Sequence, residues 1–544
     1  MQDYLKEQIA RALKKVAPDL ETPEITIEKP RSTEHGDAAT NVALTLANVL
    51  KENPRSIAQK IADQIDLSTG HIRGVEVAGP GFINFRFAGN WLTDQLVEAH
   101  RTGREFGKGR MLEHKKIQVE FVSANPTGPL TVGHGRNAVL GDTIARVLEW
   151  AGADVQREYY FNNAGRQMRV LAESVRARYL QAIGQDVVFP EGGYEGAYIT
   201  EIAERVLEKH GDSLTGEEHL PVFRQAAEES IFEDIRQTLA RMNISMDSFF
   251  NENTLYEDGS IDKVIATLRD KDLVFEQDGA TWFKTTAFGK DKDTVLIKST
   301  GEPTYRLPDI AYHINKLERG FDLALDIFGA DHIATYPDVV AAVQACGFDS
   351  DRIDVIVYQF VTIVKDGKPF KMSTRKANFV TLDELMDEVG ADVTRFFFLM
   401  RAPGTHLEFD LNEAKQAGEK NPVFYLQYAH ARIQSIMKKV RNHYDFTGKA
   451  PDFSLLAHDA ETTLIKRILE FPDVILLTAG QREPHKLIQY LNELATAFHK
   501  FYHDCRILGE DEQLALARTE LLTVTATVMA NGLGILGISV PDRM

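Results

Sequence analysis

Cysteine is nearly absent from the sequence: Cys346 and Cys505 are the only two among 544 residues, and they lie far apart. Neither belongs to a group of cysteines and histidines at the spacing of a zinc site. We therefore expect no disulfide framework, no zinc and no other metal held by the protein itself. A reducing compartment, the cytoplasm, is the simplest location.

A secretory signal and a clear membrane span are also lacking. Residues 1–15 predict an amphipathic helix with Leu5, Ile9 and Leu13 on one face, without the apolar core of a signal peptide. Residues 521–540 carry no charge and are long enough to span a bilayer. Glycines at 532, 534 and 537 interrupt this stretch, so a buried terminal helix followed by an apolar tail is favoured.

Positive charge is in deficit, with 62 basic against 80 acidic residues and a net charge of −18. This balance argues against a surface that binds DNA without specificity, but a local basic groove can still bind nucleic acid. Apolar residues make up 43% and charged residues 26%, as in globular proteins with a substantial core. The length predicts several domains.

Three patterns follow one another along the chain. Residues 1–112 alternate helix-like and strand-like segments and predict a small α/β domain that ends in a Gly-rich basic linker. Residues 113–380 predict a doubly wound parallel sheet with a mostly helical insertion at about 165–285. Its expected strands are 117–122, 155–161, 323–328 and 353–364. Residues 381–544 have helical periodicity and predict an all-α bundle.

The turn after the first strand of that sheet is the candidate ligand site, because ligands bind beyond the carboxyl ends of such strands. It reads EFVSANPTGPLTVGHGR, from Glu120 to Arg136. Gly128 and Gly133 allow close approach of the backbone, and the next helix begins near His134 with N–H groups suited to phosphate. Neither the dinucleotide-binding nor the P-loop glycine motif occurs. By itself, such a turn is more often purely structural.

Further segments make the whole chain resemble the arginyl-tRNA synthetase family of class I aminoacyl-tRNA synthetases. The turn resembles that family's HIGH region. The others are HGDAATNVAL (35–44), REYYFNNAGRQM (157–168), GEPTYRLPDIAYH (301–313), FGADH (328–332), KMSTRKANFVTLDEL (371–385), NPVFYLQYAHARI (421–433) and NGLGILGISVPDRM (531–544). The resemblance implies a class I Rossmann-like catalytic domain between an additional N-terminal tRNA-contacting domain and a helical anticodon-binding domain.

The activity implied by the resemblance has two steps. Arginine and ATP form arginyl-adenylate and diphosphate, and the 2′-OH of the terminal ribose of tRNA(Arg) then takes the arginyl group. Such chemistry needs positioning and charge stabilisation more than covalent help from the protein. We expect Mg²⁺ to accompany ATP and adenylate formation to require bound tRNA. We also expect a monomer that does not associate with a membrane.

ATP would be held by the turn and by a mobile loop over its β- and γ-phosphates. The resemblance assigns ATP binding to Pro126, Gly128, Gly133, His134, Lys371, Met372 and Ser373, and catalysis to Thr131, His134, Lys371 and Arg375. Considered alone, the basic loop is better explained as a solvated charge cluster after a hairpin.

Two positions depart from the family pattern. Thr131 stands where the HIGH motif has its first histidine, and Thr374 stands where the KMSKS motif has its second lysine. Arginine enzymes often lack that lysine, and Arg375 or Lys376 can supply the charge. We expect an active enzyme in which the Thr131 hydroxyl contacts ATP.

The resemblance places the guanidinium of arginine against Glu120, Tyr305 and Asp309. A planar fork of N–H donors is well matched by carboxylates and a phenol, whereas the compact ammonium of lysine would leave acceptors unpaired. Tyr305 and Asp309 are four residues apart, hence on one face of a helical turn, although a local helix cap would explain that pair as well. The remaining arginine contacts implied are Asn125 for the polar end of the substrate and Asp331 or His332 near its amino group.

The candidate tRNA contacts in the bundle are Arg432, Lys438 and Lys439, which could meet phosphates and bases of an anticodon loop but equally fit a solvated helix face. Three other functions stay open. One is a class I synthetase for cysteine, methionine or glutamine, although a cysteine or methionine enzyme would often show zinc-ligand cysteines. A nucleotidylyltransferase of the same superfamily would lack the long helical tail. An inactive tRNA-binding or regulatory relative is favoured by Thr131 and opposed by His134.

Overall fold

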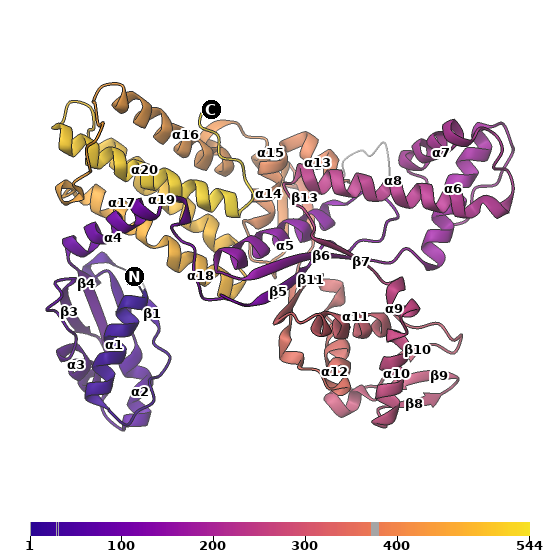
Figure 1. The fold of residues 1–544 in the computed structure, drawn as a ribbon, viewed down its shortest axis with the longest axis horizontal. Coiled ribbons are helices and arrows are strands. Elements are labelled where there is room, and N and C mark those ends of the chain that lie inside the picture. Colours follow the sequence, from indigo (N-terminus) through magenta and orange to yellow (C-terminus); the bar gives the residue numbers. More distant parts are fainter. Residues whose placement is uncertain (1, 29, 31, 371–379) are drawn as a thin grey trace.

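The computed structural model describes residues 2–28, 30, 32–370 and 380–544, which form three regions (Figure 1). The N-terminal region is an antiparallel sheet in the order β1-β2-β4-β3 with helices packed against it. Leu5, Ile9 and Leu13 of its first helix are buried, as the amphipathic pattern predicts. The elements are α1 (Gln2–Val16), β1 (Ile27–Glu28), β2 (Ala38–Thr40), α2 (Val42–Leu50), α3 (Pro54–Asp63), β3 (Ile72–Ala78), β4 (Phe82–Phe87) and α4 (Gly89–Thr102).

The central region is built on five parallel strands in the order β12-β11-β5-β6-β7. They are β5 (Lys116–Glu120), β6 (Asp154–Phe161), β7 (Ser248–Asn251), β11 (Leu323–Gly329) and β12 (Ile353–Tyr358), with α5 (Val132–Trp150), α11 (Arg306–Glu318) and α12 (Tyr336–Cys346) as connecting helices. The chain moves outward from β5 to β6 and β7, then returns beside β5 as β11. The order of strands therefore reverses between β5 and β11, which is where such sheets bind ligands. The predicted doubly wound α/β fold is confirmed.

The sequence between β6 and β11 differs in detail from the expected helical insertion. Three packed helices, α6 (Gly165–Ala182), α7 (Ala197–His210) and α8 (Leu220–Arg241), leave the sheet, but the chain returns to it at β7. A second excursion follows with α9 (Asn253–Glu257), α10 (Ser260–Asp270) and a small antiparallel sheet of β8 (Val274–Gln277), β9 (Ala280–Phe283) and β10 (Thr294–Ile297). The range 165–285 thus contains one strand of the main sheet.

The strand expected at 353–364 is two strands in two different sheets. After β12 the chain enters β13 (Val361–Lys365), which pairs with β14 (Lys368–Pro369) and with β15 (Leu407–Asp410) rather than with the five-stranded sheet. The continuous apolar pattern does not reveal this break, because both strands are rich in apolar residues.

The C-terminal region is helical, as predicted. It comprises α13 (Leu382–Val389), α14 (Ala391–Leu399), α15 (Leu411–Ala414), α16 (Pro422–Arg441), α17 (Asp459–Leu469), α18 (Phe471–Gln481), α19 (His485–Asp504) and α20 (Glu512–Ile535). Most of the charge-free stretch forms the buried second half of α20. Across the described ranges, no helix is long and apolar enough to cross a bilayer.

The central and C-terminal regions meet at Arg395 of α14, whose side chain is fully buried. Its guanidinium donates to Asp142 of α5 at 2.7 Å, to the carbonyl oxygen of Met242 at 2.6 Å and to that of Leu536 at 2.8 Å. Gly537 leaves room for it, since a Cβ there would lie 2.2 Å from the guanidinium. The last helix of the chain is thereby attached to the first helix of the central sheet.

Candidate active site

The turn after β5 begins with two residues in left-handed backbone conformation, Val122 at φ 69° and Ser123 at φ 45°. This conformation is rare for a β-branched residue and persists only where the surroundings enforce it. Asn137 of α5 does so, because its side chain accepts from the Val122 N–H at 2.6 Å and donates to the carbonyl of Ile327 in β11 at 2.7 Å. Strained backbone held at the switch point of the sheet is typical of a functional site.

Helix α5 starts in a capping box formed by Thr131 and His134. The Thr131 N–H donates to Nδ1 of His134 at 3.1 Å, and the His134 N–H donates to Oγ1 of Thr131 at 3.5 Å. Burial lowers the pKa of His134, so its ring is neutral, and because Nδ1 accepts, the proton sits on Nε2. The helix N-terminus thus presents an Nε2–H donor beside the N–H of Gly133, an arrangement that favours an anion. The Thr131 hydroxyl serves as the cap here, and its contact with ATP stays a prediction.

The loop before α5 is held by neighbouring elements. Pro126 is buried, and Gly128 lies so close to Tyr198 of α7 that a Cβ would be 3.0 Å from its hydroxyl, whereas a Cβ at Gly133 would make only an ordinary contact of 3.7 Å with Oγ1 of Thr131. Asn125 accepts from the N–H of Asn162 at 3.0 Å, which ties the loop to the end of β6. Contacts with α7 and β6 therefore hold the loop that carries the expected ATP-binding positions.

The second expected ATP segment, with Lys371, Met372, Ser373 and Arg375, falls outside the described residues. Farther along the chain, Thr381 forms a bridge with Thr131, and the N–H of Leu382 donates to the carbonyl of Leu130 at 2.8 Å. The start of α13 is thus attached to the N-terminus of α5.

Three buried acids lie in register across the neighbouring strands β6, β5 and β11. Glu120 is paired with Glu158 on one side and with Asp326 on the other, so the three side chains point to the same face of the sheet. All three are at most 4% exposed. The Ser123 hydroxyl donates to Oε1 of Glu120 at 2.8 Å.

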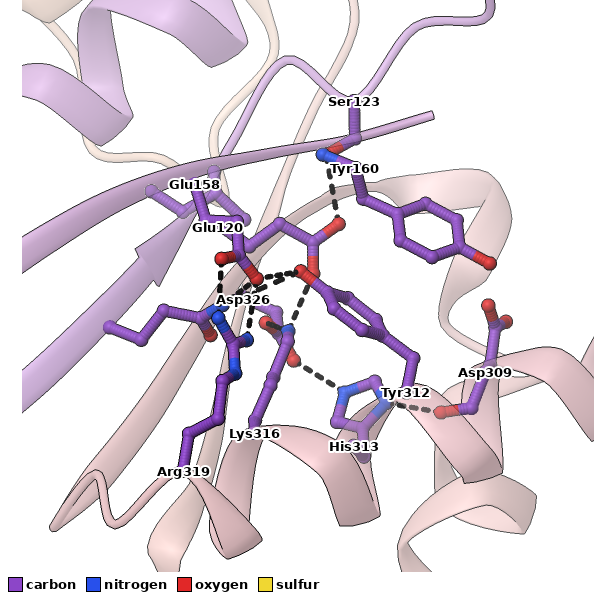
Figure 2. A network of polar contacts seen from close by, with 12 residues as sticks. Glu120, Ser123, Glu158, Tyr160, Asp309, Tyr312, His313, Lys316, Arg319 and Asp326 are labelled. Atoms are coloured by element: carbon purple, nitrogen blue, oxygen red, sulfur yellow. Dashed lines mark hydrogen bonds and ion pairs between the residues drawn. The ribbon is translucent and has the colours of Figure 1, made fainter. Parts of the chain in front are cut away.

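Helix α11 supplies cations to these three acids (Figure 2). Arg319, directly after the helix, donates to both carboxylate oxygens of Glu158 at 2.6 Å each. Nζ of Lys316 donates to Oε2 of Glu120 at 2.6 Å and to Oδ1 of Asp326 at 2.5 Å. The Lys316 side chain is completely buried, so each of these charges depends on its partner.

His313 completes the set as an imidazolium. Its Nε2 lies 2.7 Å from Oδ2 of Asp326 and its Nδ1 lies 2.7 Å from the carbonyl oxygen of Asp309. Because both partners only accept, both ring nitrogens must donate. Burial opposes that charge, but the Asp326 carboxylate raises the pKa of His313 above its usual value. Burial likewise opposes ionisation of Asp326, yet Lys316 and His313 hold its pKa below the usual range.

Asp309 lies one helical turn before His313, and its carboxylate points away from the cations toward Tyr160 (Figure 2). Burial raises the pKa of Asp309 to about 7. The backbone places it one turn after Tyr305, as expected, with a 3.3 Å hydrogen bond from the Asp309 N–H to the Tyr305 carbonyl. The Tyr305 ring, however, is 82% exposed and does not line an enclosed pocket, because it precedes the first turn of α11 and faces solvent.

Asp331 and His332 follow the carboxyl end of β11, and their contact with the substrate stays a prediction. Nε2 of His332 lies 3.6 Å from Oδ2 of Asp331, and the His332 ring stacks on Phe328 at 5.3 Å between centroids. Both are exposed.

Comparison with known proteins relates this architecture to one family. Family models match over residues 3–87 (Arginyl tRNA synthetase N terminal domain), 97–396 (tRNA synthetases class I (R), catalytic domain) and 426–544 (DALR anticodon binding domain). The arginine--tRNA ligase of Salinibacter ruber is 53% identical over 100% of both chains, and that of Desulfotalea psychrophila is 49% identical over 95% of this chain and 94% of its own. The chain belongs to the arginyl-tRNA synthetase family. The solved Thermus thermophilus arginyl-tRNA synthetase shares the fold, with a TM-score of 0.80 at 24% identity over all of both chains.

The bundle of this arginyl-tRNA synthetase family member carries an exposed group of aromatic and basic side chains. The guanidinium of Arg432 lies 5.9 Å from the ring centroid of Tyr428 and 4.7 Å from that of Tyr502. Both rings are partly exposed, at 36% and 40%. Lys438 and Lys439 are exposed in the last turn of the same helix, α16.

Lys316, His313 and Asp326 were missed by sequence reasoning, although one signal for them is present. Asp309, His313 and Lys316 follow at spacings of four and three, which places them on one face of α11. The acids could not be found in this way, because their proximity depends on the order of the strands.

Proposed function

We propose that the switch point between β5 and β11 activates arginine with ATP and then passes the arginyl group to tRNA(Arg). The observation that supports this most directly is the arrangement of two opposite sites around one turn. A neutral histidine donor at the N-terminus of α5 suits phosphate, and the carboxylate of Asp309 suits a cationic side chain. Arginine and the α-phosphate of ATP would meet between them.

In the first step, a carboxylate oxygen of arginine attacks the α-phosphorus, and the bond to the diphosphate leaving group breaks. The Nε2–H of His134 and the N–H of Gly133 at the start of α5 stabilise the charge that grows on the phosphate oxygens. Lys371 and Arg375 would add positive charge over the outer phosphates, and Mg²⁺ would enter with ATP.

In the second step, the 2′-oxygen of the terminal tRNA ribose attacks the carbonyl carbon of the adenylate, AMP leaves with the bonding pair, and the hydroxyl proton is released. We assign tRNA contacts to the N-terminal domain at 1–112 and to the bundle at 381–544, where Arg432, Lys438 and Lys439 meet the anticodon arm. The catalytic domain is then 113–380. We further propose a cytoplasmic monomer.

Arginine recognition rests on Asp309 and Glu120, with Tyr305 closing the open side when substrate is bound. Asn125, already ordered by Asn162, holds the carboxylate end, and Asp331 or His332 lies near the amino group. A guanidinium can use several acceptors at once, which an ammonium cannot do with the same geometry.

ATP–diphosphate exchange with each of the twenty amino acids, with and without total tRNA, tests this function. We expect exchange with arginine alone, and only in the presence of tRNA. Exchange with another amino acid would overturn the assignment of the pocket. Absence of exchange under every condition would favour a tRNA-binding protein without catalytic activity.

A further inference from the structure

The three buried acids and the three cations of α11 neutralise one another. Glu158 is matched by Arg319, and Glu120 and Asp326 are matched by Lys316 and His313. Asp309, on the same helix, has no such partner: no side chain of the described residues donates a hydrogen bond to its carboxylate. Glu252, another buried acid that acts on Asp309, already accepts from Tyr160 at 2.7 Å and from Asn162 at 2.7 Å.

We propose that Lys316 is a positioning residue for arginine specificity, which with His313 balances Glu120 and Asp326 so that Asp309 alone takes the guanidinium charge. The inference rests on the proposed function and adds which of the carboxylates binds the substrate charge and which are balanced within the protein. Lys316 does not touch the substrate in this scheme. It fixes one oxygen of Glu120, and the other oxygen is held by Ser123.

The geometry gives Lys316 this role because Glu120 and Asp326 are directly paired neighbours in parallel strands. Two adjacent buried carboxylates cannot both stay ionised without a cation between them, since each raises the proton affinity of the other. An ammonium shared by both, at 2.6 and 2.5 Å, removes that conflict. Without it, one proton would be taken up by the pair and Glu120 would lose its fixed orientation.

The spacing of residues along α11 also separates the side chains that balance buried charge from the side chain that binds the substrate. His313 and Lys316 face the strands, whereas the Asp309 carboxylate, one turn earlier, is directed to the side of Tyr160 (Figure 2). The ammonium of free lysine in the substrate site would then meet the Asp309 carboxylate and, beside it, a group of side chains whose charges cancel. A guanidinium can pair with that carboxylate and still donate to further oxygens at the edge of the neutral group.

The test compares Lys316→Met with Arg319→Met in arginine-dependent ATP–diphosphate exchange with tRNA present. Both variants remove a cation from the same network, although Lys316 is fully buried and the Arg319 side chain is 29% exposed, so both are expected to lower Tm, Lys316→Met by more. Only Lys316→Met should raise KM for arginine, by about tenfold or more, because one pKa unit at a carboxylate changes its anion population about tenfold. KM for ATP should change in neither, and the arginine kcat/KM profile of Lys316→Met should gain one ionisation.

The double variant Lys316→Met/Asp326→Asn restores the charge balance and should recover most of the arginine affinity, which a role in packing alone would not produce. Equal KM for arginine in wild type and Lys316→Met, an equal rise in Arg319→Met, or no recovery in the double variant would each overturn the inference. If Lys316→Met does not fold, the double variant decides: it should fold and bind arginine within about threefold of wild type, and weaker binding overturns the inference. Wild-type protein without arginine-dependent exchange would instead refute the proposed function itself.

Discussion

The ionisation of Asp309 should make arginine recognition depend on pH near neutrality. Burial raises the pKa of this carboxyl group to about 7. The guanidinium needs the carboxylate form, and at pH 6 only about a tenth of the molecules have it, against about nine tenths at pH 8. We therefore expect kcat/KM for arginine to rise about tenfold between pH 6 and pH 8, while KM for ATP stays constant.

Asp309→Asn should weaken the use of arginine while it raises the stability of the fold at pH 8. An acid whose pKa is raised in the folded protein lowers stability as pH rises from its unfolded value, here 3.8, to its folded value of about 7. The free energy lost above pH 7 is up to about 4 kcal/mol, at 1.36 kcal/mol for each pKa unit. The asparagine variant should therefore be more stable than wild type at pH 8 and equal to it below pH 4, while kcat/KM for arginine falls by at least about 30-fold.

Urea denaturation at several pH values and exchange kinetics over pH 5.5–8.5 check both effects. Asp351→Asn, which removes an exposed carboxyl at the other end of the sheet, is the control and should change neither quantity. A flat arginine profile in wild type, or a variant less stable than wild type at pH 8, would refute the reasoning.

Three further substitutions test how the site is held. Thr131→Ala removes the side-chain cap of α5 and should lower the free energy of unfolding by about 1 kcal/mol and slow exchange, whereas Thr131→Ser should preserve both; equal exchange in both variants would exclude the capping role in catalysis. Arg395→Met removes one of the three arginines that pair with buried Asp142 and takes the donor from the carbonyls of Met242 and Leu536; it should lower the free energy of unfolding by about 3–5 kcal/mol in urea, and a loss below about 1 kcal/mol contradicts this. Gly141→Ala would place a Cβ 2.2 Å from Phe121, so Tm should fall with a loss of about 1–3 kcal/mol. Gly480→Ala, in a helix with open space at that position, should leave Tm unchanged or raised.

Local patterns predicted local structure well. The apolar stripe of α1 and the strand–turn–helix at β5 and α5 follow from periodicity and from residues whose conformational preferences are strong. Thr131 is a position whose structural role was not predicted from local patterns. As a departure from a motif it indicated a loss of catalytic power, but in the structure its hydroxyl and the ring of His134 share the cap of the helix.

The pairing of segments that are distant in the chain could not be predicted from the sequence, for a physical reason. Glu158, Glu120 and Asp326 look like three ordinary strand residues until the strand order puts them in register. The break between β12 and β13 and the return of the chain at β7 likewise depend on which strand each segment pairs with, and pairing is not encoded in the segment alone.

The contacts of Arg395 have a consequence for the order of events during synthesis. Its partners Asp142 and Met242 are translated before it, but the carbonyl oxygen of Leu536 lies 141 residues later in the chain. A nascent chain on the ribosome can thus form the sheet and α5 while the Nε–H of Arg395 still lacks its acceptor, the carbonyl oxygen of Leu536. Closure around α5 becomes a late event, and half-translated molecules should remain targets for chaperones until the final helix emerges.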